Sequence, residues 1–253
     1  MKLILKMAPL PKIDKCNRVL FIGPHPDDIE IGAGGLVSKL IRNGKEVYFI
    51  ICLDGACGTM DVNADQEELA KTRKEEAIAS AKFLGVKDIF FLDYPDGGRY
   101  EVSDLRVDIA RVIIEVKPDL VVSPSPLLQT ETHMDHLRVG EAARESLLIS
   151  EFPLVAKRQG IDITKEDGFP KGISLAYYYT AKVNQRVRIK KVDLKNQLES
   201  IKYHKSQPDS TDPNLIKYIK FKAFTNGLRK CSRYGEGYYV LGPVHQHCFN
   251  ENI

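Results

Sequence analysis

The chain has 253 residues, 43% of them hydrophobic and 28% charged, a composition that suits a globular fold and excludes fibrous and disordered classes. Its formal net charge of +3 is too small to indicate nucleic-acid binding. Five scattered cysteines without a repeated pair argue against a disulfide framework and predict a reducing, cytoplasmic environment. Residues 1–12 lack the uninterrupted apolar run of a secretory signal, and no stretch is long enough to cross a membrane.

The first 150 residues alternate between strand-like and helix-like patterns. Apolar, β-branched runs predict strands at 18–24, 46–53, 88–92 and 119–123. Helical periodicity and stop signals predict helices at 36–43, 65–84, 102–116 and 136–149. This alternation predicts a Rossmann-like, three-layer α/β/α fold with a mostly parallel sheet.

After residue 150 the predicted elements become shorter and mixed in type. They comprise strands at 175–180 and 187–189, helices at 194–205 and 214–231, and a possible strand within 236–247. No internal repeat or low-complexity linker separates the two halves. We therefore expect a single domain over 1–253, with an α/β core (1–150) and a C-terminal part (151–253) that completes the sheet and forms a lid or interface.

Polar residues follow three of the predicted strands in the first half. His25, Asp27 and Asp28 follow the first strand, Asp54 follows the second, and the polar loop 123–136 follows the fourth. The carboxyl ends of parallel strands meet at one edge of a sheet, and such edges carry binding sites. These junctions are therefore expected to converge on one site.

The glycines at 32, 34 and 35 suggest a dinucleotide-binding loop, but the required third glycine is replaced by Val37. The preceding acids would also repel a pyrophosphate. Close packing of a helix start against the sheet explains these glycines better. A nucleotide-binding dehydrogenase, in which Asp54 would hold a ribose, is retained as a rival interpretation.

Two clusters carry groups that bind metals. His25 and Asp28 are three residues apart, and the T-H-M-D-H segment contributes His133, Asp135 and His136 at a helix start. Residues three apart in a first helical turn share a face, so both histidines of the second cluster can point the same way. Zinc accepts imidazole and carboxylate ligands, and together the clusters offer two or three of them, with spare acid–base groups. The plain alternative is a Pro-Asp turn and a helix cap.

These motifs resemble the PIG-L/LmbE-like family of zinc-dependent N-deacetylases. Family members carry an A-H-P-D-D-x-E loop after the first strand and an H-P-D-H loop after a later one. This chain has PHPDDIE at 24–30 and HMDH at 133–136, so Pro24 and Met134 depart from the pattern without touching a ligand. The resemblance extends to the segments TRKEEA (72–77), FLGV (83–86) and YGEG (234–237).

The resemblance implies that His25, Asp28 and His136 bind one zinc ion per chain and that Asp27 is the general base. A catalytic zinc with three protein ligands keeps an open position for water, which agrees with this division. Asp27, next to a ligand, can take the proton of that water.

Other roles follow from the same resemblance. His133 would be the second catalytic group, stabilising the oxyanion and protonating the departing amine. Asp135 would orient His133 or His136. Arg73 would contact substrate, with a surface ion pair as its alternative, and Asp54 would bind a sugar hydroxyl unless it only caps a turn. His247 would reach the substrate in the site of a neighbouring subunit, with a solvated tail residue as its alternative.

The expected reaction is hydrolysis of the N-acetyl group of a small GlcNAc-containing saccharide, either GlcNAc or diacetylchitobiose. The segment at 54–59 and the tail at 233–237 favour the chitobiose type over a GlcNAc-malate deacetylase. The resemblance also implies a homo-oligomer, a hexamer or a dimer. A non-catalytic sugar-binding protein and an ester or phosphoester hydrolase are the further rivals.

Overall fold

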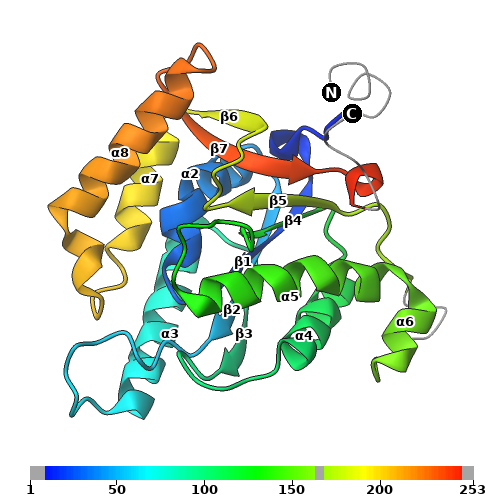
Figure 1. The fold of residues 1–253 in the computed structure, drawn as a ribbon. Helices are drawn as coiled ribbons and strands as arrows, with labels where there is room; N and C mark the ends of the chain where they lie inside the picture. The colour runs from blue at the N-terminus through cyan, green and yellow to red at the C-terminus, as the bar shows by residue number, and fades with distance from the viewer. Residues whose placement is uncertain (1–8, 163–167, 247–253) are drawn as a thin grey trace.

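A seven-stranded sheet runs through the molecule in the order β3-β2-β1-β4-β5-β7-β6 in this computed structural model, which describes residues 9–162 and 168–246 (Figure 1). Its strands are β1 (Arg18–Gly23), β2 (Glu46–Leu53), β3 (Asp88–Tyr94), β4 (Leu120–Pro124), β5 (Ser174–Tyr178), β6 (Gln185–Ile189) and β7 (Tyr234–Leu241). Strands β1 to β5 pair in parallel, whereas β7 is antiparallel to both β5 and β6. The sheet is therefore mostly parallel, as predicted.

Helices cover both faces of this sheet. They are α2 (Asp28–Arg42), α3 (Gln66–Leu84), α4 (Val102–Val116), α5 (Met134–Glu151), α6 (Pro153–Arg158), α7 (Lys191–Ile201) and α8 (Pro213–Leu228), with short 3-10 turns η1 (Ile13–Lys15), η2 (Pro208–Thr211) and η3 (Pro243–His245). The helices α2, α3, α7 and α8 share one hydrophobic core with the sheet, and α4 and α5 share the other. No helix in the described ranges has the length and apolar character needed to cross a membrane.

Strand β1 shows why the central strands are apolar throughout. Val19 and Phe21 point into one core, while Leu20 and Ile22 point into the other, and all four are fully buried. Because successive side chains of a strand alternate between faces, a strand covered on both sides needs apolar residues at every position. Polar side chains therefore occur at the two ends of the strand, at Arg18 and after Gly23.

Helix α2 corrects the predicted helix at 36–43, because it begins eight residues earlier, at Asp28. The glycines lie inside the helix, so they form no dinucleotide loop. A Cβ atom at Gly32 would lie 2.4 Å from the Tyr178 ring, and one at Gly35 would lie 2.7 Å from Oε1 of Glu236. The close packing expected of these glycines is present, with partners from the C-terminal half.

The C-terminal half extends the sheet and packs on α2. Glu236 of β7 accepts hydrogen bonds from the backbone N–H groups of Gly35 and Leu36. Gln197 of α7 donates to the carbonyl oxygen of Glu30. Helix α6, between α5 and the C-terminal strands, was not predicted.

Candidate active site

The turn between β1 and α2 positions the first cluster. Strand β1 ends at Gly23, and Asp27 precedes α2 with a left-handed φ of 112°. His25 is buried, and its Nδ1 lies 3.1 Å from Oδ2 of Asp28. The backbone N–H of His25 also donates to that oxygen. This short turn therefore holds an imidazole and a carboxylate against each other.

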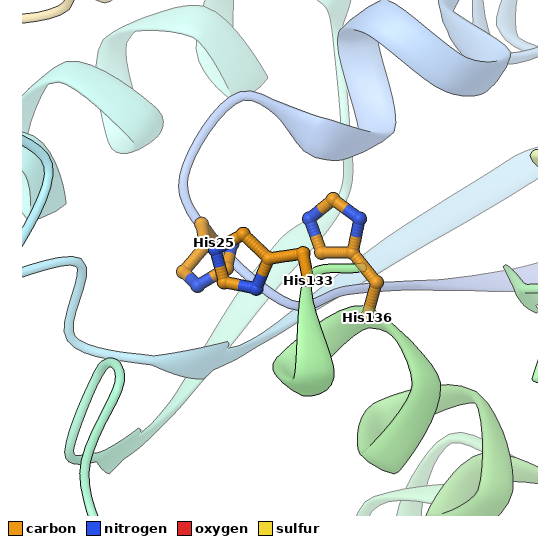
Figure 2. A group of neighbouring side chains, drawn as sticks. All are labelled: His25, His133 and His136. Carbon is orange, nitrogen blue, oxygen red and sulfur yellow. The ribbon is translucent and has the colours of Figure 1, made fainter. Parts of the chain in front are cut away.

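The second cluster lies at the start of α5. The rings of His133 and His136 stack 4.6 Å apart with 10° between their planes. Figure 2 shows both rings meeting His25 from the loop after β1; the centroid distances are 4.8 Å to His133 and 5.5 Å to His136. Nε2 of His136 lies 3.4 Å from Oδ2 of Asp28. The two motifs therefore converge at the carboxyl edge of the sheet, as expected.

This edge can hold a metal ion. Among the residues that the structure describes, ligand atoms within 4.8 Å of one another occur in two overlapping groups: His25, His133 and His136, and His25, Asp96, His133 and Asp135. Asp28, which belongs to neither group, contacts both His25 and His136 through the same oxygen. The site thus offers several imidazole and carboxylate ligands around one point.

Two acidic residues of the site were missed in the sequence. Oδ1 of Asp96 lies 3.0 Å from Nε2 of His25, on the opposite side of the ring from Asp28. Oε2 of Glu131 lies 3.0 Å from Nδ1 of His136. Asp96 follows β3, so applying the strand-end argument to the third strand would have found it. Glu131 lies in the loop after β4, but nothing in its spacing singles it out.

Arg73 on α3 is buried, with 3% of its surface exposed, so it is not the surface ion pair of the alternative interpretation. Its guanidinium donates to the carbonyl oxygens of Gly55 and Pro26 at 3.0 and 2.8 Å. It also donates to Oδ2 of Asp27 at 3.3 Å. Arg73 therefore ties the turn after β1 to the loop after β2 and contacts the predicted base.

The remaining predicted site residues have different surroundings. Oδ1 of Asp54 accepts from the backbone N–H groups of Ala56 and Asp96, which fits a role in shaping the loops. Asp135 is fully buried, accepts from the Tyr100 hydroxyl, and lies 3.9 Å from Nδ1 of His133. His247 lies outside the described residues. The substrate contacts of Asp54, Arg73 and His247 stay predictions.

The charges of the site shift several pKa values. Removal from water, reinforced by the Asp28 carboxylate, raises the pKa of Asp27. Burial opposes the charged form of Asp28, but His136 and His25 outweigh it and hold its pKa well below the usual range. Burial and the neighbouring His25 and His136 lower the pKa of His133. The pKa values of these adjacent carboxyl groups are thus shifted in opposite directions, so that Asp28 stays negatively charged while Asp27 can bind a proton.

The sequence that carries these motifs matches a known protein family. The PIG-L family, described as GlcNAc-PI de-N-acetylase, matches over residues 20–147, a range that contains both clusters. The chain belongs to this family. The family assignment and the α/β fold predicted from the sequence are thus confirmed, as is the prediction of a hydrolase that removes N-acetyl groups.

Relatives within the PIG-L family extend the match. The chain is 33% identical over 236 residues to diacetylchitobiose deacetylase of Thermococcus kodakarensis, covering 91% of this chain and 85% of the relative. It is 28% identical over 176 residues to 1D-myo-inositol 2-acetamido-2-deoxy-alpha-D-glucopyranoside deacetylase of Kineococcus radiotolerans, covering 57% and 48%.

Several solved structures share the fold of this chain. N,N'-diacetylchitobiose deacetylase from Pyrococcus horikoshii superposes with a TM-score of 0.82 at 32% identity, covering 95% of this chain and 89% of that one. GalB, a 4-carboxy-2-hydroxymuconate hydratase from Pseudomonas putida, reaches a TM-score of 0.75 at 18% identity. This second likeness shows the fold alone, and the fold can host another reaction.

Proposed function

We propose that this protein is a zinc-dependent N-deacetylase that converts GlcNAc or diacetylchitobiose to acetate and a free amino sugar. The observation that carries this proposal is the convergence of His25, Asp28 and His136 beside Asp27 and His133. The similarity to diacetylchitobiose deacetylases over most of the chain supports the choice of substrate.

The donor set fits zinc. Ligand atoms bound to zinc at about 2.0–2.1 Å in a tetrahedron lie roughly 3.3 Å from one another. Oδ2 of Asp28 lies 3.1 Å from Nδ1 of His25 and 3.4 Å from Nε2 of His136. Asp96 would then accept the proton on Nε2 of His25 and fix the tautomer that leaves Nδ1 free for the metal. Glu131 would do the same for His136 through Nδ1.

A zinc ion held there would supply Lewis acidity, which polarises an amide carbonyl and lowers the pKa of water to about 7. Asp27 takes the proton from the attacking water. Its raised pKa suits this role, because a base works best when its pKa lies near the working pH. Arg73 holds the carboxylate of Asp27 in place through its hydrogen bond to Oδ2.

His133 is proposed as the group that completes the reaction. Its side chain is 46% exposed, so it can reach the substrate. A protonated His133 would stabilise the negative oxygen and then protonate the amine as the carbon–nitrogen bond breaks. Because the pKa of His133 is lowered, its protonated ring is a stronger acid and transfers a proton to the amine more readily.

A GlcNAc-malate deacetylase is the second candidate for the substrate. A probable N-acetyl-alpha-D-glucosaminyl L-malate deacetylase of Bacillus cereus is 31% identical to the chain over 137 residues, which cover 50% of this chain and 59% of the relative. The similarity to diacetylchitobiose deacetylase extends over 91% of the chain, so we place GlcNAc and diacetylchitobiose before GlcNAc-malate as substrates. A homo-oligomer in the cytoplasm is part of the same proposal.

Acetate release from a panel of substrates tests the proposal. The panel contains GlcNAc, diacetylchitobiose, GlcNAc-malate and an acetyl ester, and each is offered to zinc-loaded and chelator-treated protein. We expect acetate from an N-acetyl sugar, lost on chelation and restored by added zinc. Acetate from the ester alone, or equal release without metal, would overturn the assigned reaction.

A further inference from the structure

A hollow of about 390 Å³ opens directly beside His136. Its walls come from the loop after β4, the segment after β5 and helix α8, and they include Thr130, Glu131, Tyr179, Tyr218 and Lys222. The volume lies within the range typical of small-molecule sites. A substrate whose amide lies at His136 therefore has room to extend into this hollow.

Tyr179 joins the hollow to the proposed metal centre. Its ring stacks on His136 at 5.9 Å with 21° between the planes, and its hydroxyl donates to the carbonyl oxygen of Asp28 at 3.3 Å. Its φ is +48°, a left-handed conformation that aromatic residues rarely adopt. The stacking and the hydrogen bond thus hold this ring beside His136, in the wall of the hollow.

Helix α8 contributes an aromatic ring and a cation to the lining of the hollow. Tyr218 is 57% exposed, and Lys222 follows one helical turn later. Nζ of Lys222 lies 5.6 Å from the centre of the Tyr179 ring and 5.8 Å from that of Tyr218. Within residues 9–162 and 168–246, Nζ of Lys222 contacts these two rings and interacts with the charge of Glu236 but makes no hydrogen bond, so its N–H donors are available to a ligand oxygen.

This combination suits a neutral sugar. The C–H face of a pyranose ring packs against exposed aromatic rings, while an ammonium group donates to its hydroxyl oxygens. Lys222 and Glu131 both line the hollow, so its walls carry one positive and one negative charge. A neutral sugar unit therefore fits this hollow better than the carboxylates of an anionic substituent.

We propose that Tyr179, Tyr218 and Lys222 form a subsite for the sugar unit that is linked to the one losing its acetyl group. This inference rests on the proposed deacetylase function and adds a specificity determinant to it. The subsite makes the enzyme prefer diacetylchitobiose over GlcNAc, because only the disaccharide can place a second ring there.

The test compares kcat and KM for diacetylchitobiose and GlcNAc in Tyr218→Ala, Lys222→Met and the double variant. For each single change we expect the disaccharide-to-monosaccharide ratio of kcat/KM to fall roughly 3- to 10-fold, mainly through KM. Tyr218→Phe keeps the ring and should preserve the ratio.

Phe221→Ala and Lys220→Met are matched controls, because both residues are exposed on α8 and neither lines the hollow. Both should leave the ratio as in the unmodified protein. An active protein that shows no preference for the disaccharide, or keeps its preference in the double variant, overturns the subsite alone. Failure of the unmodified protein to deacetylate either sugar overturns the proposed function and the subsite together.

Discussion

Asp96 orients the buried ring of His25, because its Oδ1 lies 3.0 Å from Nε2 of that ring. Loss of such a partner typically costs 10- to 100-fold in metal affinity. We therefore expect Asp96→Ala to weaken zinc binding by about 10- to 100-fold, while the protein still folds. Competition with a chelating dye measures this affinity directly.

Asp88→Ala is the control for this change, because Asp88 is exposed at the other end of the same strand, β3. It should bind zinc as the unmodified protein does. An Asp96→Ala protein with unchanged zinc affinity would show that Asp96 does not support the metal ligand.

At this scale the sequence predicted most of the site from local motifs. His25, Asp28, His133 and His136 meet as expected because the carboxyl ends of adjacent parallel strands converge. Glu131 could not be predicted from the sequence, because its contact with His136 depends on the side-chain geometry of a loop. The burial of Arg73 could not be predicted either, because its charged neighbours on α3 suggest an exposed helix face.

Helix α2 is the element on which the site depends most, because Asp28 is its first residue. Glycine normally weakens a helix by about 1 kcal/mol relative to alanine, so Gly32→Ala would stabilise an isolated helix. Here the added Cβ would lie 2.4 Å from the Tyr178 ring. We expect Gly32→Ala to lower the free energy of unfolding by about 1–3 kcal/mol, because the overpacking outweighs the propensity.

Urea denaturation with zinc removed measures this change without a contribution from metal binding. A Gly32→Ala protein that is as stable as the unmodified one would show that the contact relaxes easily. The same contact explains why the helix start was placed too late in the sequence. The cluster of glycines suggests that no helix forms before residue 36, and the packing partner Tyr178 is distant in the sequence.

The two halves of the molecule meet through a buried ion pair between Glu30 and His204, which are 2% and 1% exposed. Burial opposes the charge of His204, but the Glu30 carboxylate outweighs it and raises the pKa of His204. In turn, burial opposes the charge of Glu30, but His204 outweighs it and lowers the pKa of Glu30. The pair should thus contribute to stability most strongly where both groups are charged.

The sign of the pH dependence follows from these directions. The contribution of His204 is fully present below its unfolded pKa of about 6.5 and is lost as the pH rises through its raised folded pKa. That of Glu30 is present above its unfolded pKa of about 4.3 and is lost as the pH falls. With zinc removed from both proteins, His204→Gln should therefore destabilise more at about pH 5.5 than at about pH 9.

Denaturation at several pH values gives the free energies for this comparison. Lys202→Gln is the control, because Lys202 lies two residues before His204 and forms an exposed ion pair with Glu199, outside the buried pair. Its effect should be small and nearly constant. A His204→Gln penalty that grows with pH would contradict the assigned charges.

For the whole molecule, the parallel pairing of the first strands could be predicted because fully apolar strands alternate with amphipathic helices. The antiparallel pairing of β7 between β5 and β6 could not. It joins segments whose register depends on contacts between distant parts of the chain. Local sequence patterns were therefore enough to predict the fold class, whereas the pairing of the last strands depends on tertiary packing.

The proposed reaction depends above all on the division of roles between the adjacent residues Asp27 and Asp28. Measuring zinc content and acetate release together in Asp27→Asn and Asp28→Asn tests it most directly. We predict that Asp27→Asn keeps about one zinc per chain and loses at least about 100-fold in kcat, while Asp28→Asn loses the zinc itself. An Asp27→Asn protein with full activity would show that Asp27 is not the base, and an Asp28→Asn protein that binds zinc as tightly as before would show that Asp28 is not a ligand.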